Sequence, residues 1–268
     1  MRTTFWKTGA LAVAAGLLLV SAATAQKVSF KDPTGDDNGP GNYTYPTDGV
    51  YKRGSFDLTG LDVESKGGKV TFDVTVNSPL EDPWGMKGGF AVQMIFIFLD
   101  TGPGGFTDSL PGLNVKFDEA NAWDKVVILS PQPPGRVKDE VSTKVTGDRA
   151  GAILVPSRTK GAGRTISGTV EGLEGDPSQW GYQVIVQSNE GFPDKADLLT
   201  RKVNEYEGQH RFGGGNDGDC DPHAMDILAG SGTGDASEVQ AQHDMLKYEC
   251  NPDGTSKTGA VLKMVKKS

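Results

Sequence analysis

Carboxylates crowd together between residues 32 and 47, in a stretch that glycines and prolines keep out of regular structure. Asp32, Asp36, Asp37 and Asn38 offer oxygen ligands at close spacing, and the neighbouring glycines let backbone carbonyls turn inward. Calcium takes about six to eight oxygen ligands from carboxylates and carbonyls in flexible loops of this kind. The stretch therefore predicts a structural calcium site.

Asp57 and Asp100 complete the predicted ligand set, because each stands at the end of a predicted strand and folding can bring it to the same loop. The stretch is not an EF-hand, since the residue about twelve positions along from Asp32 is Tyr43 rather than Glu. The alternative is an acidic, solvated turn in which the aspartates hydrogen-bond to their own backbone.

Cys220 and Cys250 are the only cysteines, and in an oxidising compartment we expect them to form a disulfide. The closed loop spans roughly 30 residues, for which the chain-entropy model predicts about 3–4 kcal/mol of stabilisation. A second group of aspartates surrounds Cys220, consisting of Asp217, Asp219, Asp221 and Asp226. This group could be a second cation site or a solvated loop held by the disulfide, and we favour the solvated loop.

Carbohydrate binding usually depends on aromatic rings that lie against sugar C–H groups. Tyr43 and Tyr45 are the predicted ligand-binding residues, because they stand in a loop. We expect Trp84 and Trp180 to occupy core or turn positions. Trp84 stands within a Pro-Trp-Gly turn, and Trp180 opens an apolar strand.

The elements that position these residues are β-strands, since 37 glycines and 15 prolines separate short apolar runs. Short strands with turns about every 8–12 residues predict an all-β fold, a two-sheet antiparallel β-sandwich with long loops. The predicted strands are Phe56–Val63, Lys69–Val76, Phe90–Leu99, Lys125–Leu129, Ala152–Pro156, Thr165–Val170, Tyr182–Gln187 and Ala260–Val265.

Four segments support more detailed predictions. Lys69–Val76 alternates apolar and polar residues, which places one face in a core. Phe90–Leu99 is apolar almost throughout, so it should be central and covered on both faces. Lys66-Gly67-Gly68-Lys69 is typical of a hairpin turn. One short C-terminal helix is predicted over Val239–Tyr248, with Ser237 as its N-cap.

Residues 1–25 have the pattern of a cleaved signal peptide, with Arg2 and Lys7 before an apolar run and Ala-Thr-Ala before the cleavage site. Residues 26–268 form one predicted domain. We expect a periplasmic, cell-surface or secreted protein with no membrane insertion after cleavage. Loss of the two basic residues takes the formal charge from −8 to about −10, which argues against nucleic acid as a partner.

Further segments stand in a recognisable order along nearly the whole mature chain. They are Asp32–Thr47, Gly54–Leu58, Asp82–Gly85, Phe90–Thr101, Pro111–Val115, Trp180–Tyr182, Arg201–Val203, Phe212–Gly215 and Asp221–Leu228. Together they resemble the C-terminal module of glucodextranase, a DOMON-like, family-9-type carbohydrate-binding β-sandwich. The resemblance implies a sandwich fold, export and a place among cell-surface or secreted sugar-related proteins. It does not imply hydrolysis, because the catalytic barrel of such enzymes is a separate domain. His210 departs from the pattern, which has an aromatic residue such as Trp there.

Haem is a rival cofactor, because some DOMON relatives hold a b-type haem through Met with His or Lys. Met86 and Met94 could serve here with His210, His223 or Lys87. Met94, however, stands in an apolar strand, where packing is the ordinary role. We therefore favour calcium over haem. A periplasmic haem electron-transfer subunit stays open as an alternative.

Catalysis has the least support, since the sequence contains no Gly-x-Ser-x-Gly or His-Glu-x-x-His motif. We predict no enzymatic activity. The favoured function, which the resemblance implies, is a non-catalytic carbohydrate-binding or cell-surface-associated module stabilised by structural calcium. Its predicted partner is a polysaccharide or a cell-envelope glycan. A structural envelope protein with no small ligand is a further alternative.

Overall fold

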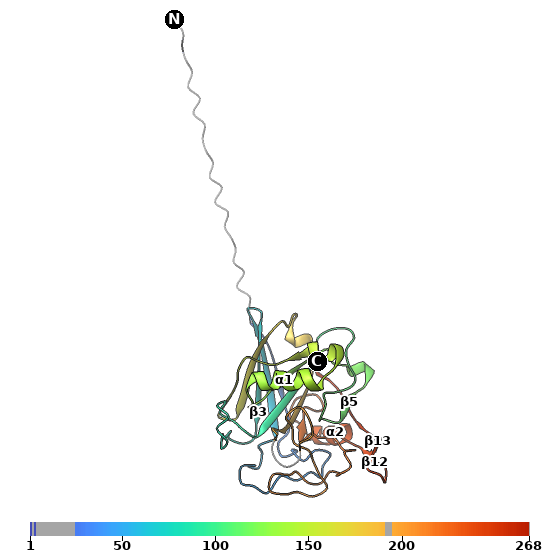
Figure 1. The fold of residues 1–268 in the computed structure, drawn as a ribbon. Coiled ribbons are helices and arrows are strands. Elements are labelled where there is room, and N and C mark those ends of the chain that lie inside the picture. The colour runs from blue at the N-terminus through green and yellow to red at the C-terminus, as the bar shows by residue number, and fades with distance from the viewer. Residues whose placement is uncertain (2, 4–24, 191–194, 268) are drawn as a thin grey trace.

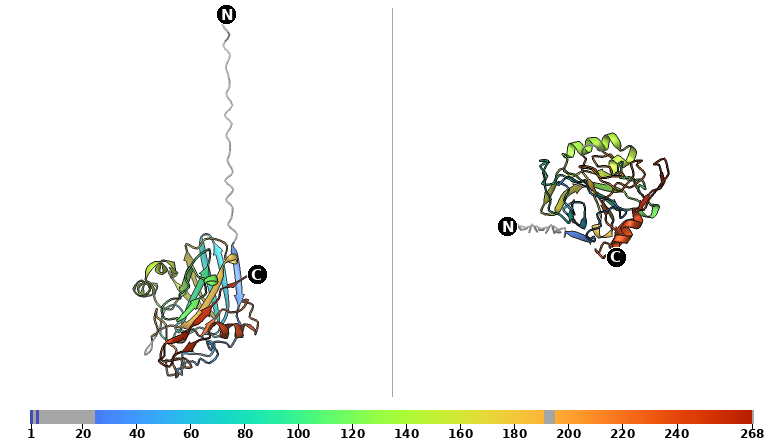
Figure 2. Two further views of the ribbon diagram at one scale, coloured as in Figure 1. Left: turned by 90° about the vertical axis from the view of Figure 1, so that its right-hand side faces the viewer. Right: turned by 90° about the horizontal axis from the view of Figure 1, so that it is seen from below.

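The computed structural model describes residues 1, 3, 25–190 and 195–267. The predicted signal peptide falls almost entirely on residues 2 and 4–24, outside the described residues. From Gln26 onward the chain forms two β-sheets that face each other, with helices and long loops around them (Figure 1, Figure 2). The predicted all-β, two-sheet sandwich is confirmed.

The first sheet is antiparallel throughout. Gly67 and Gly68, at φ 60° and 77°, form the turn between its second and third strands, and Lys66 pairs with Lys69 as predicted. Positive φ at both central residues is what this tight hairpin turn requires, and glycine meets it without a Cβ clash. In spatial order the strands are β1 (Gln26–Lys31), β2 (Leu58–Lys66), β3 (Lys69–Val76), β9 (Thr165–Glu171) and β8 (Thr159–Ala162).

The second sheet is antiparallel except where β6 and β7 pair in parallel. In spatial order its strands are β11 (Asp226–Ile227), β10 (Gly181–Ser188), β4 (Gln93–Asp100), β6 (Lys125–Leu129) and β7 (Ile153–Leu154), and β15 (Val265–Lys266) also pairs with β10. Two small ladders lie outside it. They join β5 (Val115–Phe117) to β14 (Ala260–Leu262) and β12 (Glu249–Cys250) to β13 (Ser256–Thr258).

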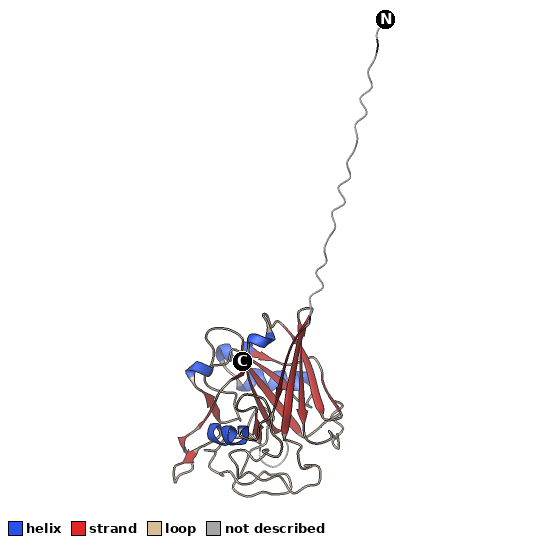
Figure 3. Ribbon diagram, turned by 180° about the vertical axis from the view of Figure 1, so that it is seen from behind, coloured by secondary structure: helices blue, strands red, loops and turns tan. Residues whose placement is uncertain are grey.

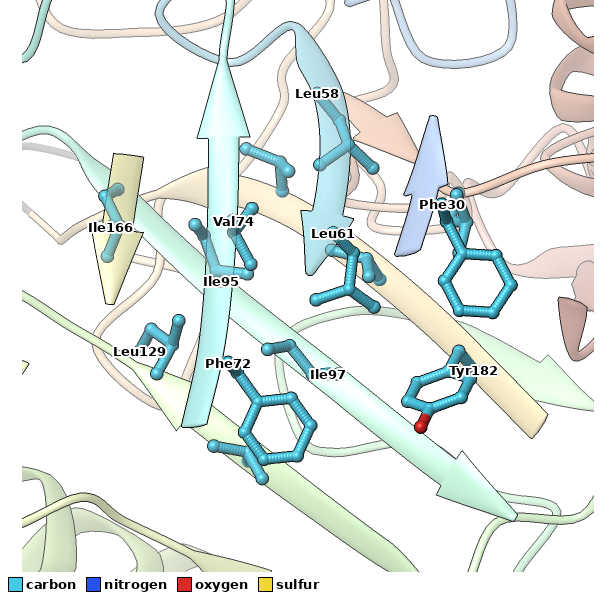
Figure 4. Close-up of a cluster of buried hydrophobic side chains, with 14 of the residues drawn as sticks. Phe30, Leu58, Leu61, Phe72, Val74, Ile95, Ile97, Leu129, Ile166 and Tyr182 are labelled. Carbon is cyan, nitrogen blue, oxygen red and sulfur yellow. The ribbon is translucent and has the colours of Figure 1, made fainter. Parts of the chain in front are cut away.

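Apolar side chains fill the space between the two sheets. Val70, Phe72 and Val74 on β3 are fully buried, as the alternation in their strand predicts. Ile95 and Ile97 on β4 join the same cluster from the opposite sheet, and Figure 4 shows side chains of both sheets meeting there. Burial of each such side chain contributes about 1.5–3 kcal/mol relative to its exposure. This core is what holds the two layers together.

Strand β4 is buried on both faces, as its nearly continuous apolar sequence predicts. Its odd-numbered residues from Ile95 to Leu99 face the core between the sheets. Its even-numbered residues from Met94 to Phe98 join a second apolar cluster on the other face of the sheet. Side chains of α1 (Pro134–Lys144), α2 (Glu238–Met245), β5 and β14 cover that cluster.

The predicted C-terminal helix is present as α2, although it ends earlier than predicted, and the Ser237 side chain bonds to Asp235 instead of capping it. Helix α1 contradicts the prediction of a single helix. It buries only Val137 and Val141, so its helical periodicity is too weak to recognise, and packing on the second sheet stabilises it. Short 3-10 turns occupy η1 (Glu119–Asn121), η2 (Gly147–Ala152) and η3 (Pro177–Gln179).

Long loops gather at the end of the sheets opposite the β2–β3 turn, which we call the loop end (Figure 3). The connections from β1 to β2, from β3 to β4 and from β10 to β11 all start at this end. Within the described residues, no helix has the length and apolar character needed to cross a membrane.

Candidate cation site and ligand surface

Three buried carboxylates meet at the loop end of the sandwich. Asp32 directly follows β1 of the first sheet, Asp226 opens β11 of the second sheet, and Asp36 lies in the loop between β1 and β2. One oxygen of each lies within 4.8 Å of the others. Asp32 is 5% exposed, Asp36 is 2% exposed and Asp226 is 0% exposed, so bulk water does little to screen their charges.

Several buried oxygens in this region accept no hydrogen bond from any described residue. They are Asp32 Oδ2, Asp36 Oδ1 and Oδ2, Asn38 Oδ1 and Asp57 Oδ1. A buried carboxylate oxygen without a partner is costly unless a cation or a proton neutralises it. The set consists of oxygen atoms alone, which are the ligands that calcium and other hard cations prefer.

Hydrogen bonds from the first sheet and its loops hold two of the carboxylates in place. Asp57 Oδ2 accepts hydrogen bonds from Gly35 N at 2.8 Å and from Asn77 Nδ2 at 3.1 Å. Asp226 Oδ2 accepts a hydrogen bond from Leu58 N at 2.7 Å. Because Leu58 begins β2 of the opposite sheet, this last bond ties the second sheet to the first.

Burial and mutual repulsion make these carboxyl groups hard to ionise. Burial, together with the charge of Asp36, raises the pKa of Asp32 to about 9. Burial also raises the pKa of Asp36 to about 7 and that of Asp57 to about 6, with smaller contributions from neighbouring carboxylates. The pKa of Asp226 is raised well above its ordinary value, again chiefly by burial. Near neutral pH, this group therefore needs protons or a cation to neutralise it.

Gln242 connects helix α2 to this group. Its Nε2 donates to the carbonyl oxygen of Asp36 at 2.5 Å and to that of Gly39 at 3.3 Å, and its Oε1 accepts from Ile227 N at 3.1 Å. The side chain is fully buried. The backbone that carries Asp36 is thus fixed by a helix from the far end of the chain.

Of the five predicted ligands, Asp32 and Asp36 lie in this group with Asp226, whereas Asp37, Asp57 and Asp100 lie outside it. Asp37 accepts a hydrogen bond from Tyr45 Oη instead. Asp100 accepts one from Lys266 Nζ at 2.7 Å, at the opposite end of β4. Ile95 lies across β10 from β11, and Asp100 lies about 17 Å further along the strand at about 3.4 Å per residue. The sequence shows that a residue stands at the end of a strand, but it does not show at which end of the sheet that residue lies.

Asp226 is the member of this group that the sequence analysis did not place with Asp32 and Asp36, because it was grouped with the aspartates around Cys220. A usable signal was present, since a lone carboxylate stands there between Met225 and Ile227 in an otherwise apolar run. A charged group on a buried strand needs a compensating partner.

The disulfide between Cys220 and Cys250 is present, with its Cα atoms 5.6 Å apart. Beside it, Asp219 Oδ1 lies 2.7 Å from His223 Nε2, and this hydrogen bond lowers the pKa of Asp219. The aspartates near Cys220 are therefore not one cluster, since Asp226 lies with Asp32 and Asp36 instead.

Tyr43 is buried and Tyr45 is partly buried, although both stand in a loop. Tyr43 is 5% exposed, and its Oη donates to Pro222 O at 2.7 Å. Tyr45 is partly buried, with its ring centroid 5.1 Å from that of Phe56 and its Oη accepting from Phe56 N at 3.0 Å. The loop folds back over the core, so the Tyr43 ring is covered and the Tyr45 ring is open only in part.

Two large aromatic side chains are exposed within the part of the chain that the structure describes. Trp84, between β3 and β4, is 37% exposed, and Tyr206, between β10 and β11, is 67% exposed. Both connections start at the loop end. Trp180 is 2% exposed, in agreement with its predicted core position, whereas Trp84 is more open than a core residue.

The two methionines considered as haem ligands pack in different places. Met86 contacts the core between the sheets, and Met94 belongs to the second cluster on the other face of β4. The sheet itself separates them. A single haem therefore cannot take both as axial ligands.

The fold and the arrangement of these residues agree with one protein family. Residues 28–264 match the family described as the C-terminal binding-module, SLH-like, of glucodextranase. The chain belongs to this family. No curated protein is significantly similar in sequence. The description of this family names a binding module rather than a catalytic domain.

Proposed function

We propose that this chain is an exported, non-catalytic carbohydrate-binding module that associates with α-glucan-like or cell-envelope polysaccharide. The observation that carries the proposal is the family match, which covers nearly the whole domain and describes the binding part of a glucan-degrading enzyme. Exposed aromatic rings at the loop end support it, because sugar C–H groups pack against such rings. The disulfide supports a periplasmic, cell-surface or secreted location.

A calcium ion held by Asp32, Asp36 and Asp226, with Asp57 beside them, is part of the proposal. Its support is the set of buried oxygens that accept no hydrogen bond from the described residues. Calcium suits these ligands better than magnesium does. Magnesium demands a regular octahedron and keeps several waters, whereas calcium accepts irregular sets of carboxylates from separate segments.

The role of this ion would be structural. It would join the end of β1 to β11 in the opposite sheet, and Gln242 would extend the connection to α2. The loop that follows Asp36 contributes Tyr45, whose ring lies against Phe56 and Phe212 in the core below the loop end. The ion would thus keep the loop end in its folded arrangement.

Binding to an array of polysaccharides and oligosaccharides, with dextran, soluble starch and purified envelope polysaccharide included, tests the glycan proposal. We expect retention of at least one of these glycans without release of reducing sugar. Retention of no glycan, combined with co-purification with an envelope fraction, would instead favour a structural envelope protein.

Elemental analysis of the native protein by mass spectrometry tests the cation. We expect calcium bound to the chain and no iron. Iron accompanied by a Soret band would support the haem alternative, and a protein free of both metals would remove the calcium from the proposal.

A further inference from the structure

Trp84 is exposed in a way that the other tryptophans of the domain are not. It is 37% exposed, whereas Trp123 and Trp180 are 0% and 2% exposed. An exposed indole leaves a large apolar surface in water, against which the C–H face of a ligand can pack. Trp84 stands in the β3–β4 connection at the loop end, where three long connections meet.

Buried groups support one side of the Trp84 ring. The Arg201 guanidinium carbon lies over the indole, 5.9 Å from the ring centroid, and also over Tyr51 at 5.5 Å. The Tyr51 ring is 6.4 Å from that of Trp84 at an interplanar angle of 71°. Arg201 is only 2% exposed, and its Nη1 donates to the carbonyl oxygen of His210 at 2.7 Å. The indole therefore rests on a fixed base and turns its remaining surface outward.

The turn that carries Trp84 is itself well fixed. The carboxylate of Asp82 accepts hydrogen bonds from Met86 N at 2.7 Å and from Lys87 N at 3.0 Å. Lys87 has a φ of 66°, a left-handed conformation that non-glycine residues seldom adopt. Strain that persists in an exposed turn needs a reason, and the placement of a functional side chain is a common one.

The three connections that meet at Trp84 also carry polar side chains in exposed positions. Lys52 Nζ lies 4.0 Å from Glu81 Oε2, and both side chains are about half exposed. Asp48 Oδ2 accepts a hydrogen bond from Gln209 Nε2 at 3.1 Å in an exposed position. Tyr51 N donates to the Asp48 carbonyl oxygen, which keeps this pair close to the aromatic group. An apolar ring with polar groups near it suits a molecule that presents C–H groups on one face and hydroxyls at its edge.

We propose that the exposed surface of Trp84 is the platform on which a neutral pyranose ring of the bound polysaccharide packs, with Arg201 and Tyr51 holding the indole in position. This proposal rests on the proposed carbohydrate-binding function and names the residue that performs it. The charges of Lys52 and Glu81 offset each other, which favours a neutral glycan over an acidic one. Tyr43, which is buried, and Tyr45, whose ring packs against Phe56, take no part in the contact.

Substitution of Trp84 tests the platform. The wild type, Trp84→Ala and Trp84→Phe are compared by affinity electrophoresis in dextran, in soluble starch and in each glycan that the array identifies. We expect W84A to weaken binding by at least about tenfold, as loss of a ring's buried apolar area requires, and W84F to keep most of the affinity. Val261→Ala is the matched control, since Val261 is also an exposed apolar side chain, at 43%, but lies on β14. It should bind as the wild type does.

Tryptophan fluorescence gives a second measurement that does not depend on the stability of a variant. Glycan binding should shift the emission of the wild type and protect an exposed indole from oxidation by N-bromosuccinimide, and W84F should show neither effect. The proposal for Trp84 would be wrong if the wild type bound a glycan without these effects, or if W84A bound the glycan as tightly as the wild type does. Either result would leave the proposed carbohydrate-binding function intact. A wild type that binds no glycan would overturn both.

Discussion

The carboxylates of Asp32 and Asp226 lie within 4.8 Å of each other at the loop end, although one follows a strand of the first sheet and the other opens a strand of the second. Their contact thus joins the two layers of the sandwich. Like charges at this distance repel each other strongly in a buried site, so what neutralises them controls the stability of the loop end.

Removal of calcium should lower the melting temperature. An ion present at about 100 times its dissociation constant adds about 2.7 kcal/mol to the free energy of unfolding. For a domain of this size that corresponds to about 5–10 °C. Thermal melts before and after exhaustive chelation, and after calcium is restored, measure the effect. Equal melting temperatures in all three samples would rule out a stabilising ion.

Substitution of Asp36 by Asn should have opposite effects with and without calcium. Neither carboxylate oxygen of Asp36 accepts a hydrogen bond from a described residue, so the change removes charge without removing such a bond. In calcium, D36N should lose about 1–3 kcal/mol, because a ligand is missing. After chelation it should be at least as stable as the wild type, because repulsion is relieved.

Asp100→Asn is the matched control for this experiment, because Asp100 pairs with Lys266 at the other end of β4. Its response to calcium should equal that of the wild type. If the response of D36N also stays normal, Asp36 does not bind the ion.

The metal-free protein should become less stable as the pH rises from about 4 to about 9. Asp32 and Asp36 have folded-state pKa values of about 9 and about 7, above the value near 3.9 of an unfolded chain. The folded chain therefore binds more protons in this range, and the stability that they contribute in acid is lost as they dissociate. Bound calcium should remove the slope. Chelated and calcium-loaded samples melted across this range provide the check, and a flat profile for the chelated sample would contradict the expectation.

Loss of the disulfide should cost about 3–4 kcal/mol. Cys220 and Cys250 are 30 residues apart in sequence, and the chain-entropy model gives this value for a loop of that length. Denaturant unfolding of the double variant Cys220→Ser, Cys250→Ser measures the difference from the oxidised wild type. A loss well below about 1 kcal/mol would mean that the bridge constrains the unfolded chain little.

Substitution of Tyr45 by Phe should reduce stability and leave glycan binding unchanged. The hydroxyl of Tyr45 donates to Asp37 and accepts from Phe56 N, so its removal leaves two groups without a partner in a half-buried place. We expect a loss of about 1–3 kcal/mol in the free energy of unfolding. Weakened glycan binding by a Y45F protein that is still folded would show that the original sequence-based prediction for this residue was right.

The main strands could be predicted from the sequence because local patterns record which faces are buried. The alternation in Lys69–Val76 and the continuous apolar run of Phe90–Leu99 both correspond to the strands that the structure contains. Helix α1 could not be predicted in this way. Only Val137 and Val141 face the second cluster, and contact with residues distant in sequence stabilises the helix.

For the candidate sites, local sequence was enough to group Asp32 with Asp36, because a short glycine-rich loop keeps neighbouring carboxylates together. It could not add Asp226, which reaches them only because β11 pairs with β10. Nor could local sequence show that Asp57 and Asp100 lie at opposite ends of the sandwich. It also could not show that Tyr43 is buried whereas Trp84 is exposed. Chain geometry governs contacts between near neighbours, whereas the end of a sheet at which a strand stops, and the side of a loop that faces the core, follow from the packing of distant segments.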